Sequence, residues 1–220
     1  MSRLIYIADP MCAWCYGFGP ELAALLEGVP GLPVDVVVGG LRPYTKVALD
    51  VESAKELKAQ WEKVAQETNL PFSYDILSRE GYIYDTEPAC RAVVAARKLA
   101  PKASLYVFHE IQRMFFSEGK DVTQGEVLAP IVCKALAEQG YPVDEATFLA
   151  TWSSDVAVKA TNDDFLLADK WELRGYPTLV LERGKELELV TAGYVAMPRL
   201  IELLLMLVEQ KGVAEAGALA

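Results

Sequence analysis

The first forty residues combine two apolar runs with an amphipathic segment between them. Leu4–Ala8 is short and apolar throughout, which is typical of a buried strand, and Val34–Val38 is a second run that a pair of glycines follows. Between the two runs, apolar residues recur at helical spacing from Cys15 to about Glu27. The pattern predicts a strand, a helix and a second strand, and strands joined in this way pair in parallel.

The middle of the chain prefers helix over its whole length. Between about residues 51 and 171, apolar residues recur at helical spacing, and Pro and Gly separate one segment from the next. The predicted helices cover residues 53–68, 87–100, 102–117, 123–138, 144–152 and 154–171.

Strand signals return near the C-terminus. Pro177–Glu182 and Leu187–Val190 predict an antiparallel hairpin with a turn at 183–185, and a helix from Pro198 to about Gln210 follows. We therefore predict an α/β fold in which residues 1–50 and 172–212 form one discontinuous domain. Residues 51–171 are expected to form an inserted helical domain, and residues 213–220 a flexible tail.

Composition and charge narrow the classes of function. With 220 residues, of which 52% are hydrophobic, the chain can bury a large core. A net charge of −10, with no cluster of Lys and Arg, argues against a nucleic-acid partner. The N-terminal apolar run is too short for a secretion signal, and Glu202 interrupts the apolar run of residues 200–209. We therefore expect a cytoplasmic protein that has no membrane segment.

The segment Asp9–Pro20, DPMCAWCYGFGP, places two cysteines where the first strand gives way to the first helix. Backbone N–H groups at a helix start stabilise a thiolate, so Cys12 is suited to attack a disulfide. Cys15, one helical turn further on, can reach Cys12 and resolve the mixed disulfide. Trp14 offers an apolar contact to an extended substrate. We predict that Cys12 and Cys15 form a reversible redox pair and that Trp14 binds substrate.

A CxxC motif can also be half of a zinc site or a structural disulfide. Zinc needs two further ligands, and the available side chains, Cys90, Cys133 and His109, are isolated on predicted helices. A structural disulfide is rare in the cytoplasm. Cys90 and Cys133 are expected to pack in the core, with a second disulfide or a redox relay as the alternative. We assign no metal site and no role to His109.

A second signal lies far along the chain, in Arg174–Leu181, RGYPTLVL, where Gly and Tyr precede a proline that opens a strand. The Tyr176–Pro177 bond can be cis there, and exposed backbone beside such a turn can pair with an extended peptide. The alternative is a proline that only initiates a strand. A CxxC after the first strand makes the combination more specific than either motif alone.

These two motifs together resemble the thioredoxin-fold superfamily, and most closely its DsbA-like branch, in which a thioredoxin-like domain carries a helical insertion. Within that branch, DPMCAWCYGFGP is similar to a cytoplasmic group of predicted protein-disulfide isomerases. The resemblance covers nearly the whole chain. It implies that Cys12 is the nucleophile, Cys15 the resolving cysteine and Pro177 the cis-proline beside them, and that Tyr176 lines the substrate groove.

The resemblance implies a thiol-disulfide oxidoreductase, a reductase or isomerase, whose only redox group is its own disulfide. Its expected partners are protein disulfides or low-molecular-weight thiols, with glutathione as a candidate thiol donor; it implies no membrane partner, and no oligomeric state is predicted.

Two features depart from DsbA itself. The residues between the cysteines are Ala13 and Trp14, whereas DsbA has Pro and His, and that histidine stabilises the thiolate; we therefore expect a milder redox centre. The absence of a secretion signal favours reducing or isomerising disulfides, or relaying oxidative stress.

Asp9 is expected to be a turn residue ahead of Pro10, although a carboxylate there could also oppose the thiolate or shuttle a proton.

Two other functions stay open. A kappa-class glutathione transferase or 2-hydroxychromene-2-carboxylate isomerase shares the fold, but these proteins generally lack the paired cysteine. A thioredoxin-like module that binds peptides or zinc without catalysis is the second alternative.

Overall fold

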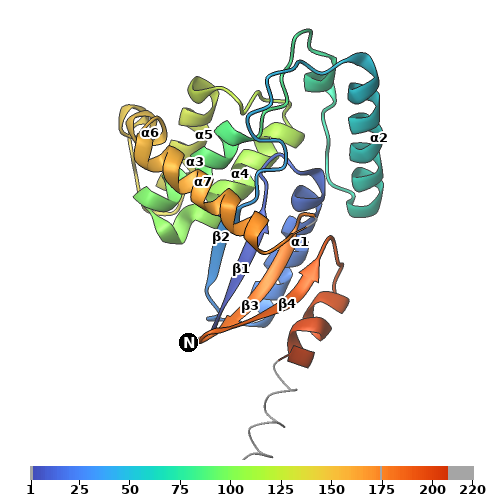
Figure 1. Cartoon of the computed structure of the whole chain (residues 1–220), viewed down its shortest axis with the longest axis vertical. Coiled ribbons are helices and arrows are strands. Elements are labelled where there is room, and N and C mark those ends of the chain that lie inside the picture. Colours follow the sequence, from blue (N-terminus) through green and yellow to red (C-terminus); the bar gives the residue numbers. More distant parts are fainter. Residues whose placement is uncertain (1, 174, 208–220) are drawn as a thin grey trace, which may run out of the picture.

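The computed structural model describes residues 2–173 and 175–207, and Figure 1 shows its arrangement. Its sheet has four strands, β1 (Ser2–Ala8), β2 (Val34–Val38), β3 (Thr178–Arg183) and β4 (Glu186–Ala192), in the order β2-β1-β3-β4. β1 is parallel to β2 and antiparallel to β3, and β3 and β4 form an antiparallel hairpin. The predicted parallel pair and the predicted hairpin are both confirmed.

The helices follow the predicted pattern with small shifts at their ends. They are α1 (Ala13–Gly28), α2 (Val51–Thr68), α3 (Glu87–Leu99), α4 (Ser104–Phe116), α5 (Gly125–Glu138), α6 (Glu145–Trp152) and α7 (Asp155–Lys170), with short 3₁₀ turns η1 (Asp75–Ser78) and η2 (Pro101–Ala103). The helix predicted over residues 102–117 begins as η2, because Pro101 starts a separate turn. Residues 199–207 are helical; the end of that predicted helix, the tail and Arg174 lie outside the described residues.

Helices α3 to α7 gather beyond one end of the sheet, and α2 stands on the other side of the view (Figure 1). Side-chain caps fix three helix starts: Asp50 for α2, Asp144 for α6 and Ser154 for α7. Within the described part of the chain, no helix is long and apolar enough to cross a bilayer.

The core packs against both faces of β1. On one face, the buried Tyr6 ring stacks on Phe18 of α1 and meets Phe108 of α4 edge-on. On the other face, Ile5 and Ile7 pack in a smaller cluster with Ala168 of α7. Because both faces are covered, the C-terminal end of β1, where the CxxC motif begins, is held in a fixed position.

An ion pair covers the outer edge of β2. Asp164 of α7 accepts a hydrogen bond from the Val38 N–H at 3.0 Å, and Arg97 of α3 donates to the Val36 carbonyl at 2.6 Å. Arg97 and Asp164 bind each other through two contacts of 2.8 and 3.0 Å. The pair thus satisfies backbone groups that an edge strand would otherwise expose, and it fastens α3 and α7 to the sheet.

Replacing Arg97 with Met should lower the free energy of unfolding by about 2 kcal/mol, because Asp164 and the Val36 carbonyl lose a charged donor. Arg113→Met is the matched control, since Arg113 is 43% exposed and pairs with Glu110 of its own helix. We expect the control to change the free energy of unfolding by less than about 1 kcal/mol. Urea denaturation measures both values. Equal losses would show that the β2 edge contact carries no special stability.

Candidate redox site

A tight turn connects β1 to α1 and presents Cys12. The Cys12 N–H donates to the Asp9 carbonyl at 3.0 Å, which closes a turn with Pro10 at its second position. Cys12 is the N-cap of α1, and its carbonyl accepts the first helical hydrogen bond from Tyr16 at 3.0 Å. The Cys12 side chain makes no capping hydrogen bond. Cys12 thus stands at the start of α1, as predicted, and its side chain is not engaged in capping the helix.

The two cysteines differ in accessibility. Cys12 keeps 6% of its surface exposed, whereas Cys15 is fully buried under the start of α1. Burial raises the pKa of the Cys15 thiol well above its ordinary value, and the hydrogen bond with Cys12 acts in the same direction. Cys12 is thus the sulfur that a substrate can reach, and Cys15 must lose its proton before it can act as a nucleophile.

The loop before β3 lies directly against Cys12. The Tyr176–Pro177 peptide bond is cis, and the Tyr176 carbonyl oxygen is 3.8 Å from the Cys12 sulfur. The Tyr176 hydroxyl donates to the Gly39 carbonyl at 2.6 Å. A Cβ atom at residue 39 would come within 2.3 Å of the tyrosine ring, so this close approach requires glycine. The fold therefore brings Cys12, Cys15, Tyr176 and Pro177 together.

Asp9 is a turn residue and also a fully buried carboxyl group. One oxygen accepts from the Met11 N–H at 2.8 Å, and the other accepts from the Leu41 N–H at 2.6 Å. The second oxygen also receives the Cys90 thiol at 3.4 Å. Burial raises the pKa of Asp9, although the two backbone hydrogen bonds oppose this shift. The charge of Asp9 in turn raises the pKa of Cys15, so the two groups share one buried environment.

Two residues from the segment just before α3, Tyr84 and Thr86, contact the turn that carries the CxxC motif. The buried Tyr84 hydroxyl donates to the Met11 carbonyl. Thr86 is fully buried, and its hydroxyl contributes to the hydrogen bonding of Asp9. Sequence reasoning missed Gly39, Tyr84 and Thr86, and the only available signal was the glycine pair after β2. Cys90 is buried as expected, but its contact with Asp9 was not foreseen.

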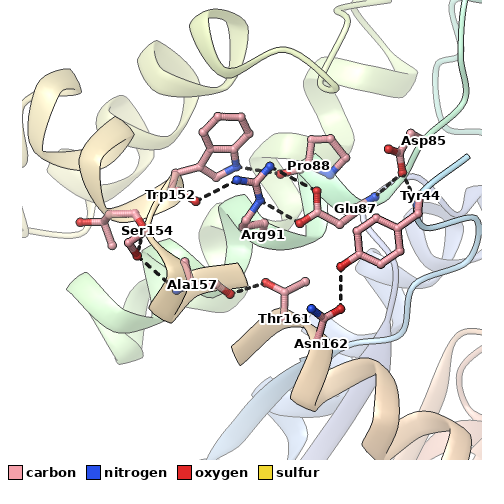
Figure 2. A network of polar contacts seen from close by, with 11 residues as sticks. Tyr44, Asp85, Glu87, Pro88, Arg91, Trp152, Ser154, Ala157, Thr161 and Asn162 are labelled. Carbon is pink, nitrogen blue, oxygen red and sulfur yellow. Dashed lines mark hydrogen bonds and ion pairs between the residues drawn. The ribbon is translucent and has the colours of Figure 1, made fainter. Parts of the chain in front are cut away.

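A polar network anchors the loop that supplies Leu41 to Asp9 (Figure 2). The Tyr44 N–H donates to Asp85 at 2.8 Å, and its hydroxyl donates to Asn162 of α7 at 2.6 Å. The same carboxylate of Asp85 accepts the Glu87 N–H at the start of α3. The loop is thereby tied to α3 and α7, which fixes the donor that faces the buried carboxyl.

The network continues along α3 to α6. Arg91 contacts Glu87 at 2.8 Å, donates to the Trp152 carbonyl at 3.1 Å and lies over the Trp152 ring at 4.1 Å. Burial raises the pKa of Glu87, and the charge of Arg91 opposes the shift. This arrangement indicates a structural role for Arg91 and Glu87.

A cleft of about 310 Å³ opens beside the redox pair. Its lining residues are Trp14, Glu67, Tyr176, Gly193 and Tyr194. The rings of Trp14 and Tyr194 lie 5.5 Å apart between centroids. The cleft thus brings together Trp14 and Tyr176, the two residues predicted to bind substrate, and adds Glu67 and Tyr194, which sequence reasoning did not single out.

The remaining candidates lie elsewhere. Cys133 is half-buried on α5, with Asp144 and Glu145 as its charged neighbours. His109 is half-buried on α4, where it contacts Gln112 at 3.1 Å and burial lowers its pKa. Across residues 2–173 and 175–207, no group of three or more His, Cys, Asp or Glu side chains could hold a metal ion.

Comparison with known proteins gives consistent results. A family model described as thioredoxin matches residues 5–194. A structure from Nitrosomonas europaea, described as a candidate protein disulfide isomerase, is 35% identical, with a TM-score of 0.84 over 95% of this chain and 98% of that one. None of the curated protein sequences compared with the chain matches it.

Another similar structure is the cytosolic disulfide reductase DsbM from Pseudomonas aeruginosa, which is 28% identical with a TM-score of 0.74 over 96% of this chain and 99% of that one. The same protein is also described with glutathione. A 2-hydroxychromene-2-carboxylate isomerase covers 98% of both chains with a TM-score of 0.59, and at 16% identity this likeness shows the fold alone.

Proposed function

Because the chain belongs to the thioredoxin family, we propose that it is a thiol-disulfide oxidoreductase that cycles Cys12 and Cys15 between dithiol and disulfide. The predicted resemblance to DsbA-like proteins is confirmed, and so is the predicted thioredoxin-like α/β fold. The observation that carries the proposal is the position of Cys12. Cys12 is the residue at the N-terminal start of α1, Cys15 is buried one turn further on, and the Cys12 sulfur lies 3.8 Å from the Tyr176 carbonyl oxygen.

The reaction follows from the two sulfur positions. The Cys12 thiolate attacks one sulfur of a substrate disulfide, so that a mixed disulfide forms and the first substrate thiol leaves. Cys15 then gives up its proton and attacks the Cys12 sulfur, which releases the second substrate thiol and leaves a Cys12–Cys15 disulfide. The substrate has gained two electrons and two protons, and the enzyme has lost them.

Asp9 is the base that we propose for Cys15: it accepts the proton of the Cys15 thiol. Both groups are fully buried, and after burial and Cys12, the negative charge of Asp9 also raises the pKa of Cys15. A carboxyl group whose pKa lies above its ordinary value is a better base for a thiol than a solvated one. Asp9 takes the proton when Cys15 attacks and returns it when the enzyme disulfide is reduced.

The direction of the reaction is proposed as reduction or isomerisation in the cytoplasm. The similarity to a protein described as a cytosolic disulfide reductase supports this direction, and the same protein with glutathione supports glutathione as the thiol donor. Ala13 and Trp14 between the cysteines support a mild redox centre, because neither side chain can carry the positive charge that would favour a thiolate strongly.

Insulin reduction and the recovery of scrambled ribonuclease test the proposal. With glutathione as donor, the protein should accelerate the precipitation of the insulin B chain above the rate with glutathione alone. Recovery of ribonuclease activity would add isomerase function, and its absence would restrict the function to reduction. No acceleration of either reaction would contradict the proposal.

A further inference from the structure

Lys63 and Glu67 on α2 form an unusual pair of charges beside the cleft. They have the i,i+4 spacing at which Lys and acidic side chains usually meet. Three other such pairs in the described residues do close, at 3.8, 3.8 and 2.7 Å: Lys58–Glu62, Lys134–Glu138 and Lys159–Asp163. In the same part of the chain, neither Lys63 nor Glu67 has an ion-pair partner. The two charges are therefore free to meet a ligand.

The two side chains take separate positions around Trp14. The Lys63 ammonium lies 5.9 Å from the centroid of the Trp14 ring, which attracts the cation. Glu67 lines the cleft with Trp14 and Tyr194. Glu67 and Tyr194 line the same cleft, and burial, with the negative charges of Glu21 and Glu67, raises the pKa of Tyr194 to about 12. An aromatic surface thus carries a cation on one part and an anion on another.

This cleft adjoins the reactive sulfur, because Tyr176 lines it and the Tyr176 carbonyl is 3.8 Å from the Cys12 sulfur. A ligand that joins its sulfur to Cys12 would extend over Trp14. A neutral ligand gains nothing from the two charges, and Glu67 repels a purely anionic ligand. A ligand that carries both an ammonium and a carboxylate can satisfy both charges at once.

We propose that the cleft selects small zwitterionic thiols and their disulfides, with Lys63 binding a carboxylate of the ligand and Glu67 its ammonium group. This inference rests on the proposed exchange at Cys12 and names the substrate class of that site. In the reductive half of the cycle, one ligand thiolate attacks the Cys12 sulfur and Cys15 leaves as the thiol. A second ligand thiolate then attacks the sulfur of the bound ligand, so that Cys12 leaves as the thiolate and the ligand disulfide is released.

The test compares two thiols that reduce the oxidised protein, glutathione and the neutral 2-mercaptoethanol. Lys63→Met and Glu67→Gln should each lower the second-order rate constant for glutathione about three- to fivefold, as expected for exposed charge contacts. The rate constant for 2-mercaptoethanol should stay unchanged. Glutathione diethyl ester, which lacks the carboxylates, should be insensitive to Lys63→Met.

Lys58→Met and Glu62→Gln are matched controls, since they remove the same charges from an already paired position on α2. They should leave all the rate constants unchanged. Equal losses for glutathione and 2-mercaptoethanol would overturn the inference, because they would indicate a general effect on the sulfur. Wild-type rates for glutathione in both cleft variants would also overturn it and leave the proposed function intact. Failure of the wild-type protein to exchange with either thiol would overturn both.

Discussion

Cys12→Ser is expected to abolish insulin reduction, because a serine hydroxyl cannot form the mixed disulfide that begins the cycle. Cys15→Ser should stop the cycle one step later. The mixed disulfide through Cys12 then forms but is not resolved, since the buried position under α1 no longer holds a thiol. Mass spectrometry of the Cys15→Ser protein after exposure to a substrate should show one substrate chain attached at Cys12.

Cys133→Ser is the control for the loss of a thiol, because Cys133 is half-buried on α5 and takes no part in the redox site. It should keep the wild-type rate of insulin reduction. Unchanged turnover in Cys12→Ser would contradict the assignment of Cys12 as the nucleophile. A substrate adduct found on Cys15 in that variant would exchange the roles of the two cysteines.

Asp9→Asn should slow the resolving step about 10²-fold, as expected for loss of a positioned base. A dithiodipyridine substrate separates the two steps, because attack by Cys12 releases the first chromophore and attack by Cys15 releases the second. Only the second phase should slow. In the wild type its rate should rise as the pH passes the raised pKa of Asp9 and the carboxylate form appears, and this rise should be absent from Asp9→Asn.

Because folding raises the pKa of Asp9, the ionisation of Asp9 also makes the free energy of unfolding depend on pH. Folding favours the protonated form of Asp9, so its contribution is fully present below the ordinary carboxyl pKa of 3.8 and is lost as the pH rises through the higher value in the folded protein. Urea denaturation at several pH values measures this effect. From acidic to neutral pH, the free energy of unfolding should fall less in Asp9→Asn than in the wild type. Asp144→Asn, at the exposed N-cap of α6, is the control and should leave the resolving rate unchanged.

A faster second phase in Asp9→Asn would contradict the proton transfer. It would instead favour the simpler effect of the carboxylate, which is repulsion of the Cys15 thiolate.

The sequence was sufficient to predict the parts of the site that depend on local order. Cys12 and Cys15 follow a strand and open a helix, and the proline at 177 opens a strand, so the pattern along the chain locates each of them. The parallel pair, the hairpin and the helical middle are also local patterns. The division into two domains stays a prediction, since a helical segment and an independent domain have the same sequence pattern.

The rest of the site depends on distant residues that packing brings together. The buried state of Asp9 results from Leu41 and Cys90, which lie 32 and 81 residues away in the chain. Local sequence around Asp9 indicates only the turn that it closes. Glu67 and Tyr194 likewise meet at the cleft from α2 and from the segment after β4. No periodicity or spacing within either segment predicts such a contact.

Equilibration with glutathione buffers of increasing oxidising strength, followed by thiol alkylation, tests the reversible Cys12–Cys15 disulfide most directly. The tryptic peptide of residues 4–46 holds both cysteines and neither Cys90 nor Cys133, so mass spectrometry can read the pair alone. As the buffer becomes more oxidising, the alkylated fractions of the two cysteines should fall together in one two-electron transition, with a slope of about 30 mV per tenfold change in the equilibrium ratio. Alkylation of both cysteines at every ratio, or of one independently of the other, would contradict a redox pair.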